Sequence, residues 1–307
     1  MKHVISIQDF SVEEIIDVLD RAEKMVAIAR GEAVSDFLKG KVLACIFYEP
    51  STRTRLSFET AMNRLGGAVV GFAGPEASSV VKGETLADTI RMVSAYADAV
   101  VLRHPREGAA RLAAEFSDVP ILNAGDGAGQ HPTQTMLDLF TIRTEMGKLD
   151  GLNISLVGDL RYGRTVHSLA IALAKLGNTI NLVSPEGLEM PGEVIGFLKD
   201  AGKFGKACHL SEDVIAETDV LYVTRIQKER FPDPVEYEKV AGVYRVDPEL
   251  VARGPEDMII LHPLPRVNEI TPEVDSLPQA KYFVQAFNAV PVRMALLSMV
   301  MGGERNA

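Results

Sequence analysis

The sequence predicts an α/β protein with two doubly wound parallel sheets that are joined by interdomain helices. Apolar runs of strand length alternate with helical patterns in the first half of the chain, at 42–47, 68–72, 99–102 and 120–122. The alternation restarts after Gly151, with apolar runs at 154–157, 179–183, 220–223 and 258–261. Such alternation is typical of parallel sheets with helices on both faces. A chain of 307 residues is long enough for two domains with separate cores.

The helical segments follow from their end signals. Ser11 and Glu14 form a capping box that opens a helix over 11–30. The segment 132–147 predicts a long helix that crosses between the domains, with Pro132 at a tolerated first-turn position and Gly147 just past its end. Further helices are expected to begin near Thr54, Thr85, Glu107, Gly163, Pro191, Ser211 and Asp247.

The domain limits follow from this order of elements. The last apolar segment, 292–301, predicts a helix that returns to the first half. We therefore expect one domain over 1–131 plus 286–307 and a second over 132–285. The segment 225–245 is rich in charge and proline and is interpreted as a mobile loop.

The composition excludes several classes of protein. Apolar residues make up 47% of the chain and charged residues 24%, and the start of the chain has no secretory pattern. No run approaches the length of a membrane span, so we expect a cytoplasmic protein. The net charge of −10 argues against nucleic acid or an anionic membrane as a partner. Cys45 and Cys208 are expected to be unpaired, buried thiols.

The segment Glu49-Pro50-Ser51-Thr52-Arg53-Thr54-Arg55 predicts an anion site, because it leads from a buried strand into a helix. The first N–H groups of a helix lack partners and, with the helix dipole, attract anions. The hydroxyl and guanidinium groups of the segment add donors that suit phosphate oxygens. The alternative without ligand binding is an ordinary helix cap beside two surface arginines.

Cations follow most of the other predicted strands, although the chain is acidic overall: Arg103, His104, His131, Arg164, Arg225, His262 and Arg266. Ligands of doubly wound sheets bind beyond the carboxyl ends of the strands. We therefore expect a positively charged cleft between the two halves, for ligands with several negative charges. A single such arginine is more often a solvated surface residue, but the repetition is difficult to attribute to chance.

Other chemistries fit the sequence less well. It has no Walker A motif and no nucleophile elbow, and 158–163 lacks the glycine spacing of a dinucleotide fingerprint. The histidines lack zinc-ligand spacing, so ordinary hydrogen-bonding roles are favoured over a metal site. The expected chemistry is group transfer by positioning and electrostatics, without a metal or cofactor and without a covalent intermediate.

Seven motifs in the same order resemble the aspartate carbamoyltransferase catalytic chain over nearly the whole length. They lie at 51–55, 78–85, 103–105, 131–134, 163–168, 224–227 and 262–266. The resemblance implies transfer of a carbamoyl group from carbamoyl phosphate to the α-amino group of L-aspartate, the committed step of pyrimidine synthesis. Two departures from the family pattern bear on domain closure: the loop 231–234 carries more proline, and Asn268 stands where aspartate is common.

The resemblance also implies a role for each site residue. The phosphate would be held by Ser51, Thr52, Arg53 and Thr54, together with Ser78 and Lys82. The carbonyl oxygen would accept from Thr54, Arg103 and His131. The carbamoyl NH2 would be held by Gln134 and by the backbone carbonyls of Leu264 and Pro265. The aspartate would be bound by Arg164, Arg225 and Gln227, with Lys82 and Leu264. On domain closure, Glu49 and Glu229 would pair with Arg164, Arg225 and Arg230.

The resemblance further implies a homotrimer with shared active sites, because Ser78 and Lys82 would come from the neighbouring subunit. It leaves open whether regulatory chains also bind to give a dodecamer. Two alternatives stay open at this point: an ornithine carbamoyltransferase and a non-catalytic carbamoyltransferase-like binding protein. Pro263 disfavours the first, since the ornithine enzymes carry cysteine there. The retention of Arg53, Lys82, Arg103 and His131 disfavours the second.

Overall fold

The computed structural model describes residues 2–74, 79–227, 231 and 242–302. The chain forms two compact units, Met1–Phe140 with Asn288–Ala307 and Thr141–Phe287. The unit boundaries fall inside the helices α5 (Pro132–Met146) and α11 (Tyr282–Met301). These units follow from packing within the chain and are not a test of the expected domain limits, which stay a prediction.

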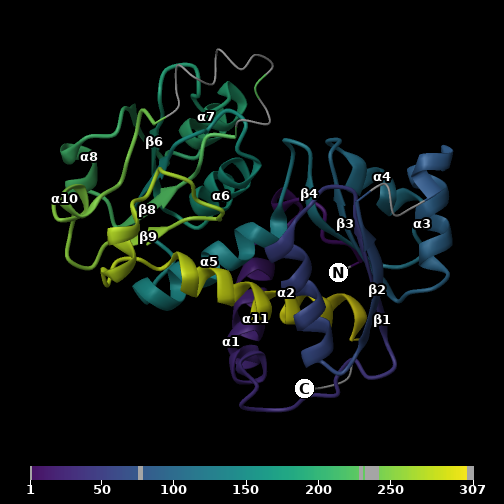
Figure 1. Cartoon of the computed structure of the whole chain (residues 1–307). Helices are drawn as coiled ribbons and strands as arrows, with labels where there is room; N and C mark the ends of the chain where they lie inside the picture. The colour runs from purple at the N-terminus through teal and green to yellow at the C-terminus, as the bar shows by residue number, and fades with distance from the viewer. Residues whose placement is uncertain (1, 75–78, 228–230, 232–241, 303–307) are drawn as a thin grey trace. The chain divides into compact units, whose positions relative to one another are not determined.

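The first unit is a parallel sheet with helices on both faces. Its strands are β1 (Val42–Phe47), β2 (Ala68–Ala73), β3 (Ala99–His104) and β4 (Ile121–Asp126). Its helices, besides parts of α5 and α11, are η1 (Ile7–Asp9), α1 (Val12–Arg30), α2 (Thr52–Arg64), η3 (Ser79–Lys82), α3 (Leu86–Ser94) and α4 (Ala109–Glu115). Within this unit, α2 lies on one face of the sheet and α3 and α4 lie on the other (Figure 1).

The strand order of this sheet is β2-β1-β3-β4, and every pair is parallel. Phe47 at the end of β1 pairs in register with Arg103 near the end of β3. The carboxyl ends of β1, β3 and β4 therefore lie side by side at one edge. Apolar side chains of β1, β3 and β4, such as Ile46, Val100 and Ile121, form the core on the face covered by α3 and α4.

The second unit repeats this architecture. Its strands are β5 (Asn153–Val157), β6 (Thr179–Val183), β7 (Phe204–Cys208), β8 (Val220–Val223) and β9 (Ile259–Leu261), in the order β7-β6-β5-β8-β9, all parallel. Its helices are α6 (Arg164–Lys175), α7 (Gly192–Asp200), α8 (Glu212–Ala216), α10 (Pro248–Val251) and η5 (Pro272–Ser276). The carboxyl ends of β5, β8 and β9 are neighbours.

The structure confirms the α/β fold class, the two parallel sheets and the capping box of Ser11 and Glu14. Among the elements that differ from the sequence expectation are β7 and α11. β7 was not predicted, because Gly205 and Lys206 interrupt its apolar pattern and it lies at a sheet edge. α11 begins ten residues earlier than the expected 292, because the helix continues through Pro291. Most of the expected loop over 225–245 lies outside the described residues.

Both cysteines are free thiols, as expected, but only Cys45 is fully buried. Burial raises the pKa of Cys45 to about 12, which suits a packing role in β1.

Helix α11 is the one helix in the described part of the chain that is long and apolar enough to cross a membrane, contrary to the sequence expectation. However, 61% of its most apolar window is buried inside the molecule, and it carries the buried polar side chains Gln285, Asn288 and Arg293. These features are typical of the core helix of a globular protein.

Candidate active site

The N-terminus of α2 follows β1 after a short loop, as expected for an anion site. Ser51 occupies the cap position, but its side chain makes no capping hydrogen bond. The first-turn N–H groups are therefore not capped by this hydroxyl. Thr54 is buried, whereas Thr52 and Arg53 are exposed. This turn thus presents backbone and side-chain donors together, which is the combination that phosphate oxygens need.

Arg103 lies beside this turn, at the carboxyl end of β3. Its side chain is only 14% exposed; its Nη1 donates to the Ala124 carbonyl at 3.0 Å, and its Nη2 lies 3.6 Å from the Glu49 carboxylate. The backbone N–H of Tyr48 donates to the Arg103 carbonyl at 2.9 Å. Arg103 is thereby fixed next to the start of α2. The sequence did not predict this contact of Glu49, which was expected to pair with arginines of the second half.

His131 directly precedes α5, Gln134 lies in the first turn of this helix, and both are buried. The loop before them is held by the buried Asp126, whose carboxylate accepts from Asn123 Nδ2 at 3.0 Å and from the Gln130 N–H at 3.0 Å. Gln134 Nε2 donates to Asp138 Oδ1 at 2.8 Å. This bond directs the amide nitrogen of Gln134 toward Asp138, so the other amide atom of Gln134 is an acceptor.

The first unit therefore brings Ser51 to Thr54, Arg103, His131 and Gln134 to the same edge of one sheet. Lys82 is the exposed last residue of η3, and Ser78 lies outside the described residues.

In the second unit, the arginines follow neighbouring strands. Arg164 is the first residue of α6, after β5, and Arg225 with Gln227 follows β8. The buried carboxylate of Asp159 joins these two loops, because it accepts from the Tyr162 N–H at 2.9 Å and from the Gln227 N–H at 3.2 Å. Burial raises the pKa of Asp159, and it outweighs the backbone hydrogen bonds, which act to lower that pKa.

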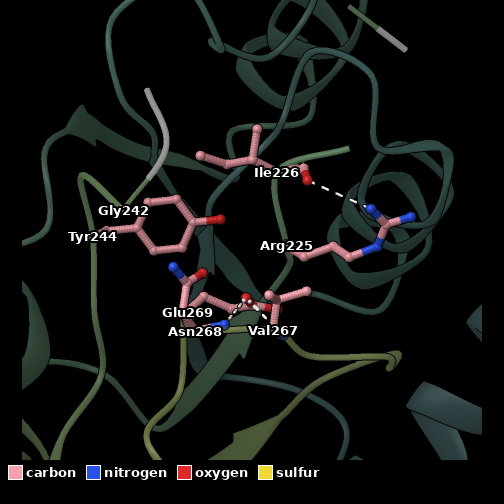
Figure 2. Close-up of a pocket in the computed structure, with 7 residues that line it drawn as sticks. All are labelled: Arg225, Ile226, Gly242, Tyr244, Val267, Asn268 and Glu269. Atoms are coloured by element: carbon pink, nitrogen blue, oxygen red, sulfur yellow. Dashed lines mark hydrogen bonds between the residues drawn. The ribbon is translucent and has the colours of Figure 1, made fainter. Parts of the chain in front are cut away.

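Arg225 lines a small cavity of about 20 Å³, which has room for about one water molecule. Figure 2 shows Arg225 and Ile226 on one side of this cavity, Tyr244 on another, and the turn of Val267, Asn268 and Glu269 below them. The hydroxyl of Tyr244 donates to the Thr224 carbonyl, one residue before Arg225. The backbone that carries Arg225 is therefore fixed from within the unit.

Leu264 and Pro265 lie in the turn after β9 and are joined by a cis peptide bond. Arg266, which the sequence placed among the strand-end cations, forms an ion pair with Asp275 and donates to the Tyr282 hydroxyl at 3.0 Å. Its guanidinium is thus part of the packing of the second unit. Glu229 and Arg230 lie outside the described residues.

Sequence reasoning missed two buried acids, Asp159 and Glu269. Each follows an apolar strand, but their partners are mostly backbone N–H groups, which leave no side-chain pattern. In the described part of the chain, no group of three histidine, cysteine or acidic side chains is arranged to hold a metal ion.

Comparison with known proteins agrees with this arrangement. Residues 2–144 match the aspartate/ornithine carbamoyltransferase carbamoyl-P binding domain, and residues 150–300 match the Asp/Orn binding domain of that family. The class is therefore an α/β carbamoyltransferase. The chain belongs to the aspartate/ornithine carbamoyltransferase family.

Three similar proteins of known name are aspartate enzymes. The aspartate carbamoyltransferase catalytic subunit of Methanocella arvoryzae is 59% identical over 98% of this chain and 97% of its own length. The catalytic subunit of M. jannaschii aspartate transcarbamoylase has a TM-score of 0.91 at 55% identity, with full coverage of both chains. The aspartate transcarbamoylase of Trypanosoma cruzi in complex with carbamoyl phosphate has a TM-score of 0.92 at 41% identity, covering 98% of this chain and 96% of its own. The resemblance seen in the sequence is confirmed.

Proposed function

We propose that the protein transfers the carbamoyl group of carbamoyl phosphate to the α-amino group of L-aspartate, giving N-carbamoyl-L-aspartate and phosphate for pyrimidine synthesis. The aspartate nitrogen forms a bond to the carbamoyl carbon, and the bond from that carbon to the phosphate oxygen breaks. The departing phosphate takes the amine proton, so no strong side-chain base is needed. The family membership and the names of the similar proteins support this reaction.

The phosphate would bind at the start of α2, through Ser51, Thr52, Arg53 and Thr54. Arg53 would bridge the phosphate and the reacting carbon. The helix N-terminus and the absence of a side-chain cap on it support this assignment. Ser78 and Lys82 would add donors from a neighbouring subunit.

The carbamoyl carbonyl oxygen gains negative charge as the amine attacks, and Thr54, Arg103 and His131 would donate to it. Prearranged donors of this kind stabilise the transition state strongly. The carbamoyl NH2 would donate to Gln134 and to the carbonyls of Leu264 and Pro265. The hydrogen bond from Gln134 to Asp138 supports the role of Gln134, because it directs an acceptor atom away from Asp138.

The aspartate carboxylates would bind to Arg164, Arg225 and Gln227, with Lys82 and Leu264 completing the site. The observation that carries the choice of aspartate is the presence of two arginines after the neighbouring strands β5 and β8. Guanidinium groups match carboxylates with paired hydrogen bonds. The side chain of ornithine is a cation and would be repelled here.

We further propose a cytoplasmic homotrimer whose subunits share active sites through Ser78 and Lys82. The name "catalytic subunit" of the similar proteins suggests an assembly with other subunits. Whether regulatory chains also bind and complete a dodecamer is tested by native mass measurement with and without added regulatory chains.

Replacing Arg53 with alanine tests the proposal at its phosphate end. Arg53→Ala is expected to lower kcat by at least about 10²-fold, the usual scale for loss of one transition-state donor. The melting temperature should stay near that of the wild type, because Arg53 is exposed. Arg111→Ala, which removes an exposed guanidinium paired with Asp9 in the same unit, is the matched control. Carbamoyl-aspartate formation by Arg53→Ala at the wild-type rate would refute the assignment.

A further inference from the structure

His262 is held in one tautomer by its two neighbours. It is buried at the end of β9, where its Nδ1 accepts the Leu264 N–H at 2.8 Å. That nitrogen therefore carries no proton, and Nε2–H donates to Glu269 Oε1 at 2.8 Å. The backbone N–H of His262 donates to Gln285 Oε1, also at 2.8 Å. The ring thus links the turn after β9 to a buried carboxylate.

Glu269 closes the other end of the same turn. Its Oε2 accepts the N–H groups of Val267 and Asn268, each at 3.1 Å, as Figure 2 shows for the cavity beside Arg225. Burial acts to raise the pKa of Glu269, but the hydrogen bonds from His262 and the backbone outweigh it and leave the pKa below its ordinary value. One charged group therefore fixes both the ring of His262 and the backbone at 267–268.

Leu264 needs such support. Its φ is 55°, the one positive value for a non-glycine residue in the described part of the chain. A side chain makes this conformation unfavourable, so it persists only where surrounding contacts impose it. The hydrogen bond from Leu264 to His262 is such a contact, and it also fixes the direction of the peptide units that follow.

We propose that His262 and Glu269 are positioning residues for carbamoyl transfer, holding the Leu264 and Pro265 carbonyls where they accept the carbamoyl NH2. The inference rests on the proposed function, in which these two carbonyls contact substrate. Glu269 orients His262, His262 holds the Leu264 N–H, and the turn then presents its carbonyl oxygens in one direction.

Two substitutions of His262 separate positioning from stability. The carbonyl oxygen of asparagine reaches about as far as Nδ1, so His262→Asn retains an acceptor for the Leu264 N–H but leaves Glu269 without its side-chain donor. The amide of glutamine reaches about as far as Nε2, so His262→Gln retains the donor to Glu269 but loses the acceptor for Leu264. A purely structural role predicts that His262→Gln is the better variant in both stability and activity.

The proposal predicts opposite orders for the two properties. His262→Gln should have the higher melting temperature, while His262→Asn should have about tenfold higher kcat for carbamoyl-aspartate formation, the scale of one well-made hydrogen bond. The inhibition constant of phosphate, whose proposed site is on the other unit, should stay unchanged in both. A kcat ratio of His262→Asn to His262→Gln below threefold overturns the proposal.

Glu269→Gln provides an independent test, because its single side-chain oxygen cannot accept from both His262 and the 267–268 backbone. Its kcat should fall about tenfold with an unchanged phosphate inhibition constant, whereas Glu273→Gln, the same change at an exposed site of η5, should keep the wild-type kcat. Wild-type kcat in Glu269→Gln overturns the positioning role. Absence of carbamoyl-aspartate formation by the wild type would instead refute the proposed function, so the two failures are distinguishable.

Discussion

The two buried acids that follow strands of the second unit have opposite pKa shifts. Burial dominates at Asp159 and raises its pKa, although backbone N–H groups donate to it. Burial acts in the same direction at Glu269, but the added hydrogen bond from His262 reverses the net shift and lowers the pKa. Glu269 therefore stabilises the folded state above its unfolded pKa, and this stabilisation is lost as the pH falls. Asp159 has the opposite dependence.

Replacing Glu269 with glutamine should therefore change how stability depends on pH. At pH 7, Glu269→Gln is expected to unfold about 1–3 kcal/mol more easily than the wild type, because buried donors lose their acceptor. This difference should shrink as the pH falls below the ordinary glutamate value of 4.5, because the unfolded wild-type chain takes up a proton there while the folded carboxylate, whose pKa is lower, is still ionised. Urea unfolding at pH 7 and at pH 4 measures it. An equal difference at both pH values would show that the carboxylate charge contributes nothing.

Among single residues, the sequence offers candidates for the ligand-binding side chains but does not indicate the residues that hold their loops. Arg103 and His131 belong to recognisable motifs after apolar strands. Asp159 and Glu269 bind backbone N–H groups of loops, and the path of those loops becomes visible only in the folded chain.

Three helices of the first unit meet at a buried guanidinium. Arg293 of α11 is 1% exposed, donates through Nη1 to Ser57 Oγ of α2, and lies with its guanidinium carbon 4.7 Å from the centre of the Phe58 ring. Burial lowers the pKa of Arg293 to about 9, and the negative charge of Asp138 on α5 opposes this shift. Arg293 therefore remains protonated at neutral pH. Ser57 also donates to the Thr54 carbonyl at 3.1 Å, so the cluster supports the first turn of α2.

Removing this charge should weaken the packing of α2, α5 and α11. Arg293→Met is expected to cost about 3–5 kcal/mol of unfolding free energy, because it leaves the buried Asp138 carboxylate without its nearby positive charge. The matched control is Arg111→Met at the surface. Urea unfolding at neutral pH gives the comparison, and equal stability of the two variants would contradict a structural role for Arg293.

The ends of elements were harder to predict than their order. α11 continues through Pro291, where a sequence pattern indicates a break, because the buried helix is held by its packing. β4 runs on to Asp126 through polar residues that are buried, so its apolar run at 120–122 understated its length. Tertiary contacts decide both cases.

For the whole molecule, the repeated β-α pattern predicted both sheets and their parallel strands. The pattern carries this information because each strand needs a helix-sized crossover to reach its parallel neighbour. Association between chains leaves no such periodic pattern, and the trimer therefore rests on the family resemblance.

A mixing experiment tests the shared sites. Lys82→Ala and Arg225→Ala subunits should each be nearly inactive alone, because each lacks one proposed aspartate ligand. After dissociation and random reassembly of equal amounts, about a quarter of the sites in a trimer should combine an intact Arg225 with an intact Lys82 from the neighbour. Activity should recover to that fraction of the wild type. Mixed samples as inactive as the parent variants would contradict sites shared in this way.

The most direct measurement is product formation by the wild-type protein from carbamoyl phosphate with L-aspartate and, separately, with L-ornithine. We predict stoichiometric release of phosphate and N-carbamoyl-L-aspartate with aspartate, and no citrulline above the uncatalysed background with ornithine. Equal or faster carbamoylation of ornithine, or no product from aspartate, would contradict the account.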